Sequence, residues 1–205
     1  MVTSAAQLRE SLDAIALLEP GFVAAIHRVG YPEPRVRAPG YETLLRTIVG
    51  QQVSVASAAA VWRKLEAELG LGCAPQALLA RDHDALRACG LSRQKQGYAR
   101  SLAELVVSGA LDLHALPADD EEAIAQLVRI KGIGRWSAEI YLLFAEGRPD
   151  IWPAGDLAVQ IEIGRILGLP DRPSEALTRT LAESWSPHRG AAAIMAWHHY
   201  NTEVL

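Results

Sequence analysis

The sequence predicts an all-α fold, and three observations support this prediction. Half of the 205 residues are hydrophobic, so the chain can bury one or two cores. Apolar residues recur at helical spacing, and proline and glycine fall between these periodic segments. No convincing alternation of apolar and polar residues indicates a strand. We therefore expect helices near residues 4–18, 21–29, 41–49, 54–69, 83–89, 92–107, 119–128, 135–145, 156–167, 174–184 and 187–200.

A polar corner interrupts the first clearly marked pair of helices. Residues 41–49 carry an apolar face, Gly50-Gln51-Gln52 ends it, and Ser54 is placed to cap a following helix that extends to about Leu69. Polar residues at an interhelical corner are usually just solvated, so the corner alone assigns no function.

The most informative stretch is Ile130-Lys131-Gly132-Ile133-Gly134-Arg135-Trp136-Ser137-Ala138-Glu139. Asp119, followed three residues later by Glu122, marks the start of a helix before it. Two glycines around an apolar residue allow a sharp turn with positive φ, and they let a phosphate approach backbone N–H groups. The pattern predicts a helix, a short hairpin that ends in Gly-Ile-Gly, and a second helix whose N–H groups and positive dipole end face outward.

The charges around this turn bear on whether it binds anything. Gly-x-Gly between two helices also fits a tight connection with no ligand. Lys131 and Arg135 flank the turn, however, and Arg129 precedes it. Because the net charge of −4 gives no global attraction for nucleic acid, DNA binding must come from such a local patch.

Three segments carry a resemblance to a known family. Residues 127–139 resemble the helix-hairpin-helix of the DNA glycosylases that have a Gly/Pro-rich loop and a following aspartate, the HhH-GPD superfamily. Residues 48–56, and Leu91-Ser92-Arg93-Gln94-Lys95, are similar to segments of its 3-methyladenine DNA glycosylase II family. The likeness covers about residues 8–201.

The resemblance implies a two-lobed helical fold with a cleft between the lobes. One lobe would span about residues 36–150 and contain the helix-hairpin-helix at 120–145; the second would combine 1–35 with 151–205. Longer relatives begin with an α/β domain of roughly 100 residues, for which this chain lacks room. We expect one glycosylase unit of the short form.

Asp156 is the expected catalytic residue. It lies twenty residues beyond Trp136, after Pro153-Ala154-Gly155 and before an apolar segment. An aspartate in this position also caps a helix, and the two roles are compatible. A carboxylate at a helix N-terminus stays ionised, and cleavage of an N-glycosidic bond develops positive charge on the sugar. The carboxylate could also orient or deprotonate the attacking water. In the family the aspartate at this spacing has that role.

Trp136 indicates which chemistry follows. In members that also cut the DNA strand, a lysine stands two residues after the second hairpin glycine and forms a Schiff base with the sugar. Trp136 occupies that position, and Lys131 lies before the turn. We expect a monofunctional glycosylase that leaves an abasic site. Cys73 and Cys89 are too few for the iron–sulfur branch and are expected in the core.

The resemblance also implies DNA contacts. The corner would enter the minor groove, with Gln52 filling the gap left by the flipped nucleotide. The full expected set of DNA-binding residues is Gly132, Gly134, Lys131, Arg135, Ser137, Gln51, Gln52 and Ser54. Arg93 and Lys95 either contact the DNA backbone or are solvated, and the sequence leaves both open. In relatives, the carbonyls at Val128, Ile130 and Ile133 hold a monovalent cation, Na⁺ or K⁺, that bridges to phosphate.

The C-terminal segment is expected to complete the base pocket. Ser186 and Pro187 fit the N-cap and first position of the last helix. Trp197 on that helix could simply be a core residue, but the resemblance implies that it lines the base pocket. With Trp136 it would offer an aromatic face to a base made cationic by alkylation, worth about 1–2 kcal/mol when desolvated. His198 and His199 are adjacent and lack further ligands, so we expect surface or packing histidines.

The expected function is removal of alkylated purines from double-stranded DNA, of the 3-methyladenine and 7-methylguanine type, in base excision repair. No cofactor is expected for the chemistry, and no signal peptide or transmembrane run indicates a membrane. We expect a cytoplasmic monomer, associated with the nucleoid if bacterial. The alternatives are a glycosylase for another damaged or mismatched base, and a DNA-binding module or protein adaptor without chemistry.

Overall fold

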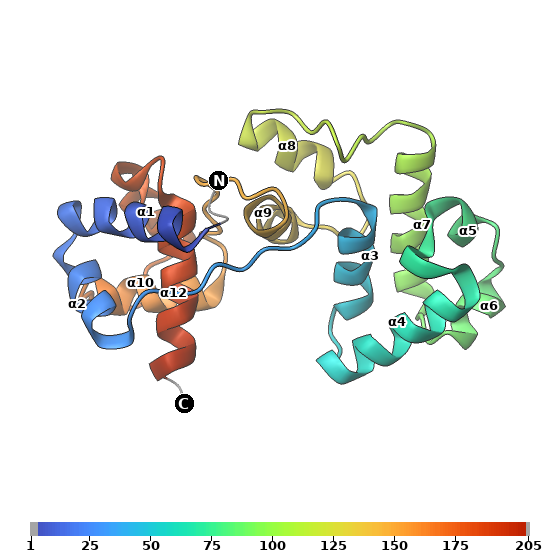
Figure 1. Cartoon of the computed structure of the whole chain (residues 1–205), viewed down its shortest axis with the longest axis horizontal. Coiled ribbons are helices and arrows are strands. Elements are labelled where there is room, and N and C mark those ends of the chain that lie inside the picture. The colour runs from blue at the N-terminus through green and yellow to red at the C-terminus, as the bar shows by residue number, and fades with distance from the viewer. Residues whose placement is uncertain (1–3, 204–205) are drawn as a thin grey trace. The chain divides into compact units, whose positions relative to one another are not determined.

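The structure, a computed structural model, describes residues 4–203. In this range it contains helices and no strand, which confirms the all-α class (Figure 1). No helix among the described residues is long and apolar enough to cross a membrane. The α-helices are α1 (Ala5–Leu18), α2 (Pro20–Val29), α3 (Tyr41–Gly50), α4 (Val55–Leu69), α5 (Pro75–Leu79), α6 (His83–Ala88), α7 (Arg93–Val107), α8 (Asp120–Leu127), α9 (Arg135–Phe144), α10 (Leu157–Ile166), α11 (Glu175–Leu181) and α12 (Arg189–Glu203), with 3-10 helices η1 (Leu71–Cys73) and η2 (Glu183–Trp185).

The predicted helices are present with small differences at their ends, but α5 has no counterpart in the prediction. Its five residues are too few for an apolar period to show, and Pro75 at the first helical position was its only signal. Ser54, Asp119 and Asp156 cap α4, α8 and α10 as expected, since each side chain accepts a backbone N–H of the first turn.

The chain forms two compact units. One spans residues 38–141, and the other combines the two ends of the chain, up to Arg37 and from Leu142. The sequence placed the second boundary near residue 150, whereas it falls inside α9. The last turn of α9 belongs to the chain-end unit because the Arg37 N–H donates to the Phe144 carbonyl at 2.8 Å and the Phe144 ring contacts Trp197 at 5.6 Å between centroids.

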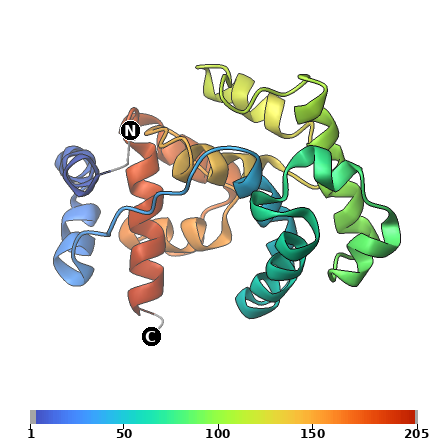
Figure 2. The same ribbon diagram turned by 45° about the vertical axis from the view of Figure 1, so that its right-hand side comes forward.

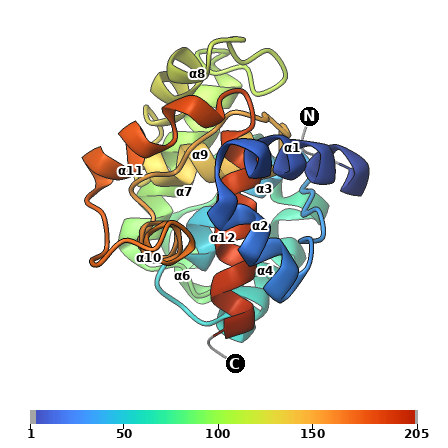
Figure 3. The same ribbon diagram turned by 90° about the vertical axis from the view of Figure 1, so that its left-hand side faces the viewer.

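The chain-end unit is organised around α12. Helices α1, α2 and α10 pack on it, as Figures 2 and 3 show for the red helix. Trp185 is fully buried, with its ring 5.3 Å from Phe22 and 5.6 Å from Trp152 in edge contacts. Helix α2 approaches α10 so closely that a Cβ at Gly21 would lie 2.1 Å from the Ile166 carbonyl oxygen. Only glycine fits there.

In the unit of residues 38–141, α7 is the central element. Helices α3, α5 and α6 pack against it, and Figure 1 shows α7 between α3 and the two shorter helices. The apolar core includes Leu44, Leu45, Leu65, Leu86 and Leu102, all fully buried. Cys73 and Cys89 are buried and free, as expected for core residues.

The expected start of α12 was wrong. Ser186 does not cap this helix, and the Ser186–Pro187 bond is cis, outside the helix. Asp150 takes the capping role instead. Its carboxylate accepts the Arg189 N–H at 3.2 Å, the Arg189 guanidinium at 2.7 and 2.8 Å and the Ser186 hydroxyl at 2.7 Å. The cap comes from 39 residues upstream, so local sequence gave no sign of it.

Candidate functional site

The hairpin between α8 and α9 is shaped by one of its two glycines. Gly132 has φ +83°, and a Cβ there would lie 2.2 Å from the Tyr98 ring. Gly134 does not have positive φ, contrary to the expectation for both glycines, and a Cβ there would meet nothing within 4 Å. Gly132 is thus required by the fold. The open space at Gly134, directly before α9, leaves room for a ligand to approach.

Buried residues hold the hairpin while its outer surface stays exposed. Ile130 and Ile133 are buried, and the Ile133 N–H donates to the Ile130 carbonyl at 3.0 Å. The Lys131 backbone N–H donates to the Ser101 hydroxyl at 3.1 Å, and the lysine itself is exposed to solvent. The first N–H groups of α9 have no acceptor within their own helix. Together with the helix dipole they suit an anion.

Arg135 is engaged by two acids of its own unit. Its guanidinium donates to Glu121 and, at 2.9 Å, to Glu139, which is only 2% exposed. The hydrogen bond with Glu121 is the largest cause that raises the pKa of Arg135 above its ordinary value. Arg135 therefore neutralises a buried carboxylate. Lys131, by contrast, has no ion-pair partner among the described residues and remains the cation that can meet a phosphate.

The polar corner after α3 contains an unusual backbone conformation. Gln52 is exposed and has φ +54°, in the left-handed region that non-glycine residues rarely adopt. Ser54 caps α4 by accepting the Ser57 N–H at 3.2 Å. The Gln51 side-chain amide donates to the Gly132 carbonyl at 2.8 Å. Gln51 thus joins the corner to the hairpin.

The sequence left two roles open for Lys95, a contact to the DNA backbone or a solvated side chain, and the structure shows a different one. Its ammonium donates to the Val49 carbonyl at 2.8 Å, in the last turn of α3. Burial lowers the pKa of Lys95 below its ordinary value. The amine therefore satisfies a helix C-terminus. Arg93, two residues earlier, is exposed and has no recorded partner in the described part of the chain.

Asp156 and Trp197 meet within the chain-end unit. Oδ1 of Asp156 accepts the Val159 N–H at 3.0 Å and the Trp197 indole N–H at 3.2 Å. The first bond caps α10, and the second comes from α12. Two donors on one oxygen orient the carboxylate, and the N-terminus of α10 favours its negative charge. The sequence named both residues but did not predict this bond.

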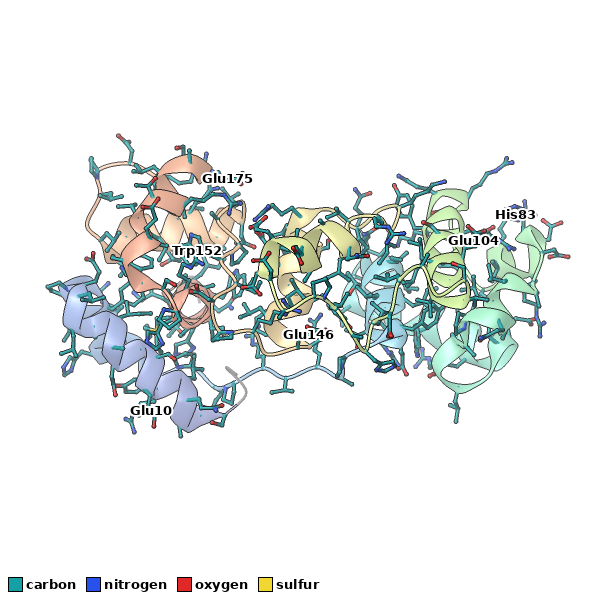
Figure 4. All side chains as sticks on the ribbon, turned by 90° about the horizontal axis from the view of Figure 1, so that it is seen from above. Glu10, His83, Glu104, Glu146, Trp152 and Glu175 are labelled. Atoms are coloured by element: carbon teal, nitrogen blue, oxygen red, sulfur yellow. The ribbon has the colours of Figure 1, made fainter. Side chains whose placement is uncertain are left out.

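A glutamine that the sequence analysis missed supports the loop before Asp156. Gln160 is buried, and its amide donates to the Ala154 carbonyl at 2.7 Å while its oxygen accepts Arg172 at 2.9 Å. Trp152, labelled in Figure 4, is also buried and donates its indole N–H to the Thr178 carbonyl at 3.0 Å. The only sequence signal for Gln160 was a polar residue within an apolar helix.

Trp197 also lines a pocket of the chain-end unit. The pocket has a volume of about 180 Å³, with walls from Tyr31, Phe144, Ile194 and Trp197, and with Glu33 and Arg35 among its polar lining residues. Three aromatic rings give it flat apolar faces. Trp136 is 49% exposed at the start of α9 and belongs to the other unit. Its contribution to a base pocket stays a prediction.

The histidines of α12 are packing residues, as expected. His199 lies 2.6 Å from buried Glu162, which also accepts Arg165. His198 contacts the Val29 carbonyl at 2.9 Å. Among residues 4–203 no group of three metal-ligating side chains occurs. The carbonyls of Val128, Ile130 and Ile133 lie in the hairpin, and that of Ile130 already accepts one hydrogen bond. A carbonyl has a second lone pair, so this set remains compatible with a cation.

Comparison with known proteins agrees with this geometry. Residues 45–188 match the family model of the HhH-GPD superfamily base excision DNA repair proteins. The chain is 33% identical over 161 residues to DNA-3-methyladenine glycosylase 1 of Schizosaccharomyces pombe, covering 77% of this chain and 71% of that protein.

Two solved structures share the fold. A DNA-3-methyladenine glycosidase from Bacillus halodurans has a TM-score of 0.87 at 28% identity, over 95% of this chain and 90% of that one. The S. pombe 3-methyladenine DNA glycosylase in complex with abasic DNA has a TM-score of 0.77 at 29% identity, over 96% of this chain and 97% of that one.

Proposed function

Because this chain belongs to the HhH-GPD superfamily of base excision DNA repair proteins, we propose that it is a monofunctional DNA glycosylase that removes alkylated purines, of the 3-methyladenine and 7-methylguanine type, from double-stranded DNA. The observation that carries the proposal is the Asp156 carboxylate, held on one oxygen by Val159 and Trp197. The relatives' names supply the substrate class.

Asp156 supplies the charge that the reaction needs. As the N-glycosidic bond of a flipped nucleotide breaks, positive charge develops on the sugar, and a fixed carboxylate stabilises it. The same group can orient the water that attacks the sugar carbon. The bond electrons leave with the base, which is already a good leaving group when alkylated. The product is an abasic site.

The base itself would occupy the aromatic pocket beside Trp197. The pocket has a volume of about 180 Å³, and its flat aromatic walls suit stacking with a purine. Aromatic faces attract a cationic base more than a neutral one. We keep Trp136 as a proposed further aromatic contact of the base.

The absence of a strand-cutting step follows from the residue types around the turn. Trp136 stands where a Schiff-base lysine would be, and it has no amine. Lys131 is exposed but precedes the turn. The hairpin would bind phosphate through the N–H groups at Gly134 and α9, with Lys131 beside them and a monovalent cation on the carbonyls of Val128, Ile130 and Ile133. We propose that the enzyme acts on DNA as a monomer, in the cytoplasm or nucleoid.

The test is base release from methylated duplex DNA, assayed with and without alkali. We expect free methylated purines, and strand breaks only after alkali. Spontaneous breaks would overturn the monofunctional assignment. A folded protein that binds DNA but releases no methylated base would overturn the substrate class, and release of another base would then identify a different excision enzyme.

A further inference from the structure

One face of α7 touches both DNA-facing elements of its unit. Lys95, Tyr98 and Ser101 are three residues apart and therefore lie on the same side of the helix. Lys95 donates to the Val49 carbonyl at the end of α3. Ser101 accepts the Lys131 N–H, and the Tyr98 ring fills the space beside Gly132. The corner after α3 and the hairpin before α9 thus rest on one rigid helix.

A second connection joins these elements directly. The Gln51 amide donates to the Gly132 carbonyl at 2.8 Å. The acceptor of this bond, Gly132, is the hairpin residue that has left-handed φ and lies against Tyr98. Corner, hairpin and α7 therefore form a closed set of contacts within residues 38–141.

Gln52 directly follows two anchored positions of the corner, Val49 and Gln51. A non-glycine residue with φ +54° is strained, by about 1 kcal/mol or more, and persists only where its neighbours impose the conformation. Val49 is held by Lys95 and Gln51 is held by Gly132. Both anchors stand on the N-terminal side of the strained residue, and two residues after it Ser54 is fixed as the cap of α4.

We infer that Lys95 and Gln51 are positioning residues that keep Gln52 in its left-handed conformation and in register with the phosphate-binding hairpin, an inference that rests on the proposed function of this surface. Capture of the backbone by the hairpin and insertion of Gln52 at the flipped nucleotide then occur at a constant spacing. Lys95 acts through the α3 carbonyl and not through DNA phosphate. It is half-buried with its amine engaged, unlike exposed Arg93 on the same helix.

Lys95→Met tests this assignment, because methionine keeps an unbranched apolar chain and removes the ammonium. We expect affinity for undamaged duplex within about twofold of the parent, but about tenfold weaker preference for a duplex with an abasic-site analogue. The fluorescence rise of 2-aminopurine beside the analogue, which reports unstacking, should shrink in parallel. Lys95→Arg, which keeps a donor, should recover at least part of both signals.

Arg93→Met is the matched control on the same helix. If Arg93 meets phosphate, its loss weakens binding to both duplexes alike and lowers the salt dependence by about one charge; if it is solvated, nothing changes. Either result differs from that expected for Lys95→Met. Gln51→Met, at a half-exposed position, should reproduce the loss of abasic-site preference without lowering the thermal stability.

Three results would overturn the inference. Equal weakening of both duplexes by Lys95→Met would make its amine a phosphate contact. Parent behaviour of Lys95→Met and Gln51→Met would remove any positioning role. Failure of Lys95→Arg to recover either signal, in a folded protein, would do the same. The binding ratio and the fluorescence need no base release, so failure of the proposed glycosylase activity would be seen separately.

Discussion

The hairpin before α9 and the loop before α10 each lead into the N-terminus of a helix, but they differ in the residue that precedes the helix. The residue before α9 is Gly134, which has no side chain to cap the helix and has open space above it. The residue before α10 is Asp156, whose own carboxylate accepts a backbone N–H of that helix start, the one of Val159. One helix start can receive an anion from outside, and the other supplies an anion of its own.

The hydrogen bonds around the two helix starts also differ. Around α9 the contacts are to backbone, from Gln51 and Ser101, and they leave Lys131 exposed. At α10 the side chain before the helix is itself held, by the Trp197 indole on Asp156, and Gln160 supports the preceding loop through the Ala154 carbonyl. Backbone N–H groups suit a repeating phosphate that carries no sequence information, whereas a reaction at one bond needs one carboxylate in one orientation. The difference fits the proposed division between DNA binding at α9 and chemistry at α10.

Asp156→Asn should have the largest effect. Asparagine keeps the size and can still accept from Val159 and Trp197, but it removes the negative charge. We expect the single-turnover rate of methylated-base release to fall by about 10³-fold or more, while binding to duplex with an abasic-site analogue is retained. Excision at the parent rate would refute the catalytic assignment and leave α10 with an ordinary cap.

Asp150→Asn tests a third helix start, that of α12, which carries Trp197. Burial alone would raise the pKa of Asp150, but the hydrogen bonds from Arg189 and Ser186 outweigh it, so the pKa lies below its ordinary value. A lowered carboxyl pKa stabilises the fold above the unfolded value, near 3.9, and this stabilisation is lost as the pH falls through the folded value. We expect a loss of about 2 kcal/mol in the free energy of unfolding at pH 7.

The pH dependence distinguishes this cause from a packing defect. Denaturant unfolding of parent and variant should differ at pH 7 and converge as the pH is lowered below about 4. A difference that stays constant over this range would show that charge at Asp150 does not stabilise α12. Asp171→Asn, an exposed aspartate of the same unit, serves as the control and should change little at either pH.

These helix starts also show which features of the structure could be predicted from the sequence alone. The caps Ser54, Asp119 and Asp156 were predictable because capping is a local pattern of one side chain and the next turn. The cap of α12 was not, since Asp150 arrives from 39 residues away. Lys95 could be seen as a cation but not as the partner of a carbonyl 46 residues earlier. Local sequence patterns predicted the helices and their local caps, whereas hydrogen bonds between residues far apart in the chain could be found only in the structure.

Gly134→Ala should have a moderate effect confined to binding. A Cβ there meets no atom of the protein and the backbone does not need positive φ, so the variant should fold with an unchanged melting temperature. The methyl group would stand where a phosphate approaches, and we expect about tenfold weaker binding to all duplex sequences alike. Gly132→Ala, with its left-handed φ and its Cβ against Tyr98, should instead destabilise the fold. A sequence-selective loss for Gly134→Ala would contradict the phosphate role.

The smallest effect concerns the lining of the Trp197 pocket, where Glu33 and Arg35 carry opposite charges and have no ion-pair partner among the described residues. Both are exposed, so solvent screens them and each should alter rates by only about two- to threefold. Glu33→Gln should lower the release of cationic 7-methylguanine relative to a neutral base such as hypoxanthine, if the parent accepts both, because it removes an attraction for the cation. Arg35→Gln should raise the same ratio, since it removes a repulsion.

The ratio of the two release rates is the measurement, because a general loss of stability would lower both rates and leave their ratio unchanged. Shifts of the same sign in the two variants would show that charge at this pocket does not select the base, and selection would then rest on the aromatic faces and the leaving group alone.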